Sequence, residues 1–240
     1  GLSESFSNVV LFYNKDMFDA AGVSYPNADW TWTDAVAAAK KMTDPAAGKW
    51  GLFKPVQFWE FYKTIQQNGC SFFNADQTQV MVNAPKCVET LQPMFNFQTT
   101  DKVMPTDADM GGVGDGDLFK SGKLGMLVTG IWMFAGFKDA GFNWDIAVEP
   151  GITQKATHFV SNGIVVNKDT PNAQAAYEWA KFFTTSKDAA TIRVNAGWEL
   201  PALQDKSLFD SYLSQTPPAN RQAVFDSLNY LVTPPVIERQ

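Results

Sequence analysis

Short apolar runs alternate with amphipathic segments along the chain. Val9–Tyr13, Trp50–Phe53, Leu124–Val128 and Trp144–Glu149 are too short for membrane spans and are typical of buried strands. A further strand is predicted over Phe159–Asn167, where Gly163 marks a bulge or a close backbone approach. Helical periodicity fills the intervals between these runs, and this alternation of strands and helices indicates an α/β fold.

Capping residues set the ends of several predicted helices. Asn14 and Gly22 bound the first, and Thr31 and Asp34 have the spacing of a capping box for the second. Trp32 then anchors that second helix in the core. Further helices are predicted from Pro85 onward, with a kink or break at Pro93, over Lys187–Ala196, Ser207–Ser214 and Ala219–Leu231, and after Thr170, with Ala176, Trp179, Ala180 and Phe183 on its buried side.

Two tryptophans fall at the ends of predicted elements. In the helix after Pro55, Phe58, Phe61 and Ile65 form the expected buried stripe, and Trp59 lies beside it as either a ligand platform or a core residue. Trp132 follows the strand Leu124–Val128, at the carboxyl end where open α/β sheets bind ligands.

Charge and composition narrow the function classes. The 19 basic and 25 acidic side chains give a net charge of −6, which argues against nucleic acid and anionic membranes as partners. Aromatic residues make up 14% of the chain, with eight tryptophans. Together with low charge, this composition suits an uncharged polar ligand.

Candidate catalytic chemistry is sparse. The sequence has no nucleophile elbow and no phosphate-binding loop, and its single histidine, His158, is interpreted as structural or exposed. We expect no cofactor and no metal. The aspartates between Asp107 and Asp117 are interpreted as a solvated loop rather than a calcium loop, with Asp115 capping the next short helix. Cys70 and Cys87 fit either a disulfide or two free thiols.

Aromatic residues at element ends have polar neighbours. Sugar rings offer apolar C–H faces to indoles and hydroxyls to amides or carboxylates, so this pattern favours a carbohydrate ligand. The tryptophans concerned are Trp59, Trp132 and Trp198, beside Gln57, Thr129 and Glu199. A carboxylate pair such as Glu60 with Glu199 would instead suit a glycoside hydrolase.

Several segments resemble the extracellular solute-binding proteins of ABC sugar importers, in the branch that includes maltose-binding protein. The resemblance runs in register over most of the chain. It is carried by Leu11–Phe18 with Ala21-Gly22, Trp30–Asp34 with Ala38–Thr43, Phe119–Met126 with Gly130-Ile131-Trp132, Ala175–Phe183, Gly197–Pro201 and Pro234-Pro235.

The resemblance implies a periplasmic-binding-protein type II lobe, with a mixed sheet flanked by helices and the N-terminal lobe missing. Residues 1–203 would form the C-terminal lobe with crossover strands at its ends. Residues 204–240 would form a helical segment that returns toward the absent lobe. Cys70 replaces a glycine common in a family turn, and a bond to Cys87 would pin that turn to the next helix.

The resemblance also assigns ligand-binding residues. These are Trp132, Trp59, Gln57, Trp198, Glu199, Asn162 and Asn8, although Gln57 stands where the family has a carboxylate. The implied function is that of a non-enzymatic, monomeric sugar-binding component of an ABC importer that delivers its ligand to permease subunits. The implied location is extracellular or periplasmic, with membrane contact only through a lipid anchor on the missing N-terminus. The alternatives are a sugar phosphate or polyol as ligand, or a glycoside hydrolase.

Overall fold

The structure is a computed structural model that describes residues 1–197 and 200–236. Its strands are β1 (Leu2–Asn14), β2 (Met126–Gly130), β3 (Trp144–Ala147), β4 (Thr157–Ile164), β5 (Leu200–Pro201) and β6 (Leu231–Val232). Its α-helices are α1 (Lys15–Ala21), α2 (Trp32–Met42), α3 (Phe58–Gln66), α4 (Pro85–Thr99), α5 (Asp107–Met110), α6 (Asp115–Lys120), α7 (Phe134–Phe137), α8 (Ala173–Thr185), α9 (Lys187–Asn195), α10 (Lys206–Leu213) and α11 (Gln222–Ser227). Short 3₁₀ turns are η1 (Pro45–Ala47), η2 (Ile131–Met133) and η3 (Leu228–Tyr230).

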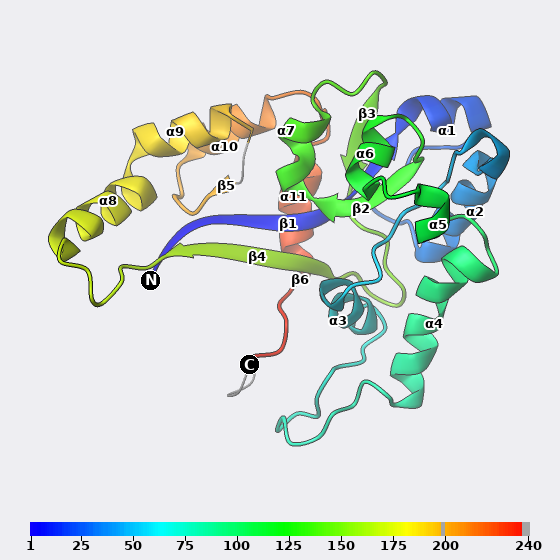
Figure 1. The fold of residues 1–240 in the computed structure, drawn as a ribbon, viewed down its shortest axis with the longest axis horizontal. Helices are drawn as coiled ribbons and strands as arrows, with labels where there is room; N and C mark the ends of the chain where they lie inside the picture. The colour runs from blue at the N-terminus through cyan, green and yellow to red at the C-terminus, as the bar shows by residue number, and fades with distance from the viewer. Residues whose placement is uncertain (198–199, 237–240) are drawn as a thin grey trace.

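Strand β1 runs through the middle of the molecule (Figure 1). Its C-terminal half pairs antiparallel with β2 on one side and β3 on the other, and its N-terminal half pairs antiparallel with β4 and β5. Strand β6 adds a parallel pairing to β4. The result is the mixed sheet flanked by helices that the sequence predicted.

Successive residues of β1 feed two separate cores, because side chains alternate between the two faces of a strand. Val10 and Phe12 join a cluster that includes Phe134 and Trp144 and extends to α9, α10 and α11. Val9 and Leu11 join a second cluster built with α1 and α2. The buried run Val9–Tyr13 therefore holds two helical layers together, one on each face.

The predicted caps form as expected. The Asn14 side chain accepts from the Met17 amide, and Gly22 ends α1 in the left-handed conformation with φ +63°. Thr31 and Asp34 make a reciprocal capping box at α2. The Trp32 side chain is buried, as predicted, and its Nε1 donates to Gln67 Oε1 at 2.7 Å.

The prediction of a strand over Trp50–Phe53 is wrong. The Trp50 and Phe53 amides donate to the carbonyls of Lys123 and Met126, just before and at the start of β2. The Leu52 amide between them donates instead to the carbonyl of Val103. Gly51 also presses against α2, where an added Cβ would lie 2.2 Å from the Ala39 carbonyl oxygen. The segment therefore makes two isolated bridges, to Leu124 and Leu127, and one backbone hydrogen bond to Val103 instead of a continuous ladder.

The expected buried stripe of α3 is only partly correct, because Ile65 is buried but Phe58 is not. Phe58 is 52% exposed, whereas the charged side chains of Glu60 and Lys63 are buried. Oppositely charged partners satisfy both groups inside the protein, so this helix buries a polar face that apolar periodicity does not reveal.

The structure also changes three smaller expectations. Gly114, not Asp115, occupies the capping position of α6, and Asp115 lies in the first turn. Helix α4 continues through Pro93 as one element, so the chain does not break there, and a kink at this residue stays a prediction. The register irregularity near Gly163 is confirmed, but the extra residue lies in β1 between Ser3 and Ser5, which pair with Gly163 and Asn162.

Helix α8 lies at one end of the molecule, beyond the tips of β1 and β4 (Figure 1). Of the residues predicted to be buried on this helix, Ala180 is buried, but Trp179 is 60% exposed. Much of the predicted face is therefore uncovered. In the segment predicted to return toward another lobe, α10 packs beside α9, and α11 packs against β1 and β3. The division at residue 203 remains a prediction.

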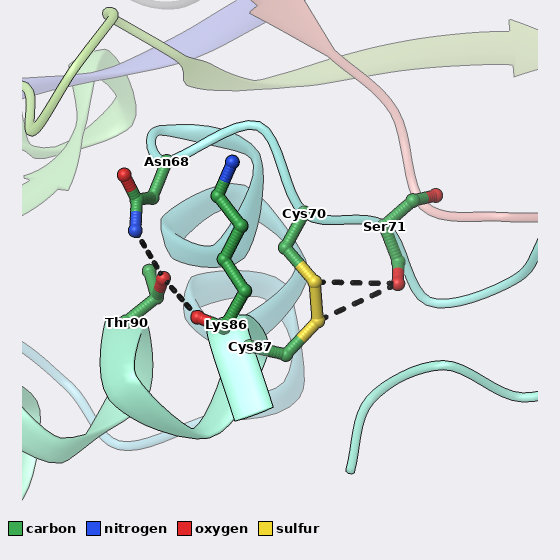
Figure 2. The surroundings of a disulfide bond; sticks show 6 residues. All are labelled: Asn68, Cys70, Ser71, Lys86, Cys87 and Thr90. Carbon is green, nitrogen blue, oxygen red and sulfur yellow. Dashed lines mark hydrogen bonds between the residues drawn. A yellow bond between two sulfur atoms is a disulfide. The ribbon is translucent and has the colours of Figure 1, made fainter. Parts of the chain in front are cut away.

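A disulfide joins Cys70 to Cys87, with their Cα atoms 5.6 Å apart. Figure 2 shows that it links the turn after α3 to the first turn of α4. Close to it, Asn68 Nδ2 donates to Thr90 Oγ1 at 2.9 Å, so the same two segments are joined twice. Within the described residues, no helix is long and apolar enough to cross a membrane.

Candidate functional site

Trp132 lies where β2 turns into η2. Ile131 beside it is buried in the core, whereas the Trp132 side chain is 41% exposed. The indole packs directly on Gly130, where an added Cβ would fall 2.0 Å from a ring carbon. The glycine therefore does more than bend the chain, because its missing side chain makes room for the indole at the strand end.

Gln57 and Trp59 form a second wall at the start of α3. Gln57 is the residue before the helix, but its side chain caps no backbone amide. Instead Gln57 Oε1 accepts from Trp59 Nε1 at 2.6 Å. Since the indole can only donate, this bond fixes the orientation of the amide and leaves the Gln57 NH₂ group available as a donor.

These two walls enclose a cavity of about 360 Å³. The structure thereby brings together three residues that the sequence singled out, from segments more than 70 positions apart. The cavity is lined by Gln57, Trp59 and Trp132, together with Asp115, Gly116, Thr129, Met133 and His158.

The polar groups of the cavity differ between its two walls. Asp115, from the first turn of α6, is the one carboxylate among the described lining residues, and no lysine or arginine lines the cavity. His158 enters from β4, with its ring centroid 5.7 Å from that of Trp59. The site therefore combines aromatic surfaces with a few polar groups, which is the usual character of small-ligand sites.

A cluster of four buried charges lies under Trp59. Lys54 contacts Glu60 at 2.7 Å and Glu149 at 3.0 Å, while Lys63 contacts Glu60 at 2.5 Å and also pairs with Glu149. The Lys63 ammonium lies 5.7 Å from the centroid of the Trp59 ring. This ion cluster, defined as Lys54, Glu60, Lys63 and Glu149, fixes the position of α3 and hence of the Trp59 wall.

Electrostatic partners outweigh burial in this cluster. Burial by itself would raise the pKa of Glu149, but Lys54 and Lys63 hold that pKa below its ordinary value. Burial would lower the pKa of Lys54, but Glu149 and Glu60 raise it instead. Both groups therefore stay ionised at neutral pH.

Two other predicted site residues, Asn8 and Asn162, lie outside the cavity lining. Asn8 is fully buried in β1 and donates to the Val224 carbonyl at 2.9 Å, and Asn162 on β4 donates to Ser5 Oγ at 3.0 Å. Neither lines the cavity. Trp198 and Glu199 fall outside the described residues.

Three polar residues that line the cavity were not predicted to be site residues from the sequence. Asp115 was interpreted as a helix cap, His158 as structural or exposed, and Thr129 only as a neighbour of Trp132. His158 reaches the cavity because β4 pairs with β1 and because Tyr62 of α3 bonds its ring. No local motif signals such a contact, since Tyr62 lies 96 positions away.

A larger cavity of about 760 Å³ lies between α2 and α4, with Trp32 and Phe97 among its lining residues. None of the predicted ligand residues that the structure describes lines it. The indole nitrogen of Trp32 is already bonded to Gln67. Of these two cavities, we favour the smaller as the functional site because it gathers exposed aromatic walls and polar groups from separate element ends.

Comparison with known proteins supports one family. The family model for the bacterial extracellular solute-binding protein matches residues 2–190. An ABC substrate-binding protein from Listeria monocytogenes, solved in complex with cycloalternan, shares 53% sequence identity with a TM-score of 0.96, and the match covers 99% of this chain and 61% of that one.

Two curated relatives agree at lower identity. A putative binding protein of Brucella abortus (strain 2308) is 24% identical over 220 residues, which is 89% of this chain and 53% of the relative. The maltotriose-binding protein of Pyrococcus abyssi is 25% identical over 186 residues, which is 75% of this chain and 39% of the relative. The chain thus spans about half the length of its curated relatives or less. It belongs to the family of bacterial extracellular solute-binding proteins.

Proposed function

We propose that the intact protein captures an uncharged oligosaccharide against the Trp59 and Trp132 walls and delivers it to the permease of an ABC importer. The observation that carries the proposal is the cavity itself, in which two tryptophans from separate elements flank an amide, a hydroxyl, an imidazole and a carboxylate. Indole surfaces suit the C–H faces of sugars, and the polar groups suit their hydroxyls. The cycloalternan complex of the Listeria relative and the maltotriose-binding relative support this ligand class.

The charge of the cavity favours a neutral sugar over a sugar phosphate. A phosphate needs Lys or Arg donors, and the described lining residues include neither. Lys63 lies behind Trp59, but its charge is matched by Glu60 and Glu149. An anionic ligand would instead meet the Asp115 carboxylate.

Binding without catalysis is the proposal that the carboxylates support best. Glycoside hydrolysis needs two carboxyl groups about 5–9.5 Å apart on either side of the scissile bond. Asp115 is the one carboxylate among the described residues that line the cavity. Turnover of chromogenic glycosides that is abolished in Asp115→Asn would contradict the binding-only proposal.

We infer that the part of the longer protein outside this chain covers the exposed face of α8 and supplies the opposite wall of the ligand cleft. Tyr177, Trp179 and Phe182 are all about half exposed or more, which is unusual for neighbouring aromatic residues on one helix. An apolar dye should therefore bind the 240-residue chain more strongly than the longer protein. Equal binding by both would argue against a covered α8 face.

Secretion, anchoring and assembly follow from the same proposal. The intact protein would work outside the cytoplasmic membrane as a monomer, held at the surface by a lipid anchor. Metabolic labelling with a fatty acid, followed by fractionation, tests the anchor. A protein that carries no lipid and is released freely would contradict it.

The binding test is calorimetric titration of the intact protein with cycloalternan, maltotriose, a polyol and glycerol 3-phosphate. We expect binding of at least one of the two oligosaccharides, and at least about tenfold weaker binding after Trp132→Ala or Trp59→Ala, which corresponds to about 1.4 kcal/mol. Phe95→Ala is the control, because Phe95 is exposed to a similar degree on α4 and does not line the cavity. Absence of oligosaccharide binding, or full binding by Trp132→Ala, would overturn the proposal.

A further inference from the structure

A hydrogen bond joins the second turn of α3 to the cavity. The Tyr62 side chain is fully buried, and its hydroxyl pairs with Nδ1 of His158 on β4. Burial, followed by the nearby charge of Glu60, raises the pKa of Tyr62, so the phenol keeps its proton. The other acceptor near this hydroxyl is the Val232 carbonyl at 3.5 Å, which is too long for a strong bond. The phenol proton therefore goes to Nδ1.

The imidazole is neutral under ordinary conditions. Burial, assisted by the positive charge of Lys63, lowers the pKa of His158 to about 4, and Glu149 opposes this shift. A neutral imidazole carries one proton, on one ring nitrogen. Because Nδ1 accepts from Tyr62, that proton must lie on Nε2. No bond from Nε2 to another described residue occupies it, and His158 lines the cavity.

We propose that the Nε2–H group of His158 donates a hydrogen bond to an oxygen of the bound sugar, and that Tyr62 is the positioning residue that holds His158 in this tautomer. The inference rests on the proposed function, since it assigns a contact within the same site. It makes His158 a residue that determines specificity.

The resulting site is polarised. His158 and the Gln57 amide both offer donors beside Trp59. The Asp115 carboxylate offers acceptors, and its neighbour Gly116 packs on Met133, the residue after Trp132. A bound pyranose should therefore turn ring or glycosidic oxygens toward Trp59 and hydroxyl protons toward Asp115. This arrangement would favour one orientation of the bound sugar, in addition to selecting an uncharged ligand.

The first test reads the tautomer directly. The chain contains a single histidine, so nitrogen-15 spectra of the intact protein carry one pair of side-chain signals. We expect the Nε2–H tautomer between about pH 5 and 8, and a change in the Nε2 signal when cycloalternan or maltotriose is added. Tyr62→Phe should let the Nδ1–H tautomer appear, whereas Tyr177→Phe on exposed α8 should not.

The second test separates the two ring nitrogens by substitution. In His158→Gln the amide nitrogen can take the place of Nε2, whereas in His158→Asn it takes the place of Nδ1. We expect His158→Gln to bind within about threefold of wild type and His158→Asn to bind about tenfold more weakly.

The outcomes distinguish the two proposals. An Nδ1–H tautomer in the wild-type protein, or equal binding by His158→Asn and His158→Gln, would overturn the role of His158 while leaving sugar binding intact. Failure of both oligosaccharides to bind the wild-type protein would overturn the proposed function, and an unmoved Nε2 signal would accompany it.

Discussion

Replacing Glu149 with glutamine should destabilise the protein strongly, because the ion cluster has no solvent to compensate a missing charge. All four side chains of the cluster are at most 1% exposed. Glu149, on the β3–β4 connection, contacts both lysines, as Glu60 does from α3. The substitution keeps the shape of the side chain and removes its charge, so two buried ammonium groups would share the single carboxylate of Glu60.

The size of the effect follows from the burial. Removing one partner of a buried ion pair costs about 3–5 kcal/mol, since the remaining charge stays desolvated. For a chain of this length, each kcal/mol lowers the midpoint of thermal unfolding by about 2–4 °C. We therefore expect Glu149→Gln to lower the unfolding temperature by about 6–20 °C.

The assay is thermal unfolding followed by circular dichroism, with urea unfolding as an independent measure. Lys63→Met combined with Glu149→Gln restores charge balance and leaves the Lys54–Glu60 pair in place. The double variant should lose less stability than the two single variants added together, by about 1–3 kcal/mol. Lys40→Met is the control, because the Lys40–Asp101 pair is solvent-exposed on its lysine side and contributes at most about 1 kcal/mol.

Two results would refute this reasoning. One is a decrease of less than about 1 kcal/mol in the free energy of unfolding of Glu149→Gln. The other is strict additivity in the double variant, which would mean that Glu149 and Lys63 do not interact energetically in the folded protein.

Three further predictions concern the disulfide, pH and Gly130. Replacing Cys70 and Cys87 by serine opens a loop with a sequence separation of 17 and should lower the free energy of unfolding in urea by about 3 kcal/mol. Adding a reductant should not destabilise this variant further. A loss of less than about 1 kcal/mol would argue against a stabilising disulfide. Because the folded-state pKa of Glu149 lies below its ordinary value of 4.5, its contribution to stability is complete above about pH 4.5 and declines as the pH falls through the folded-state pKa. If the unfolding temperature of Glu149→Gln depends on acid pH in the same way as that of the wild type, this expectation is wrong. Gly130→Ala should weaken oligosaccharide binding at least about tenfold by displacing the Trp132 ring, whereas Gly141→Ala, which meets no atom within 4 Å, should bind normally; equal binding by both would exclude this displacement.

Several outcomes were predictable from the sequence because their causes are local. The Thr31–Asp34 box and the Gly22 end of α1 depend on residues within one helical turn of each other. The strand over Val9–Tyr13 is buried on both faces, so continuous apolarity was sufficient to identify it. Trp132 was singled out because it follows a strand end, and the structure places it in the candidate cavity, whereas its contact with a ligand stays a prediction.

Local reasoning failed where distant partners reverse the ordinary preference of a residue. Lys63 is buried because Glu149, 86 positions away, supplies its counter-charge. Trp179 remains exposed because no described part of this chain covers its side of α8, although its helical spacing resembles that of a core residue. Asp115 enters the cavity from the first turn of α6 rather than capping the helix.

By itself, the sequence determined the alternation of elements, the capped helix ends, the central strand and the two aromatic walls, because these depend on neighbours along the chain. Only the tertiary structure decided that Gln57, Asp115, Trp132 and His158 share one cavity, since strand pairing and helix packing bring them together. It also placed the Tyr62 hydroxyl on Nδ1 of His158, the contact on which the proposed tautomer rests. Contacts between distant residues set charge, burial and proton position, and no local pattern encodes them.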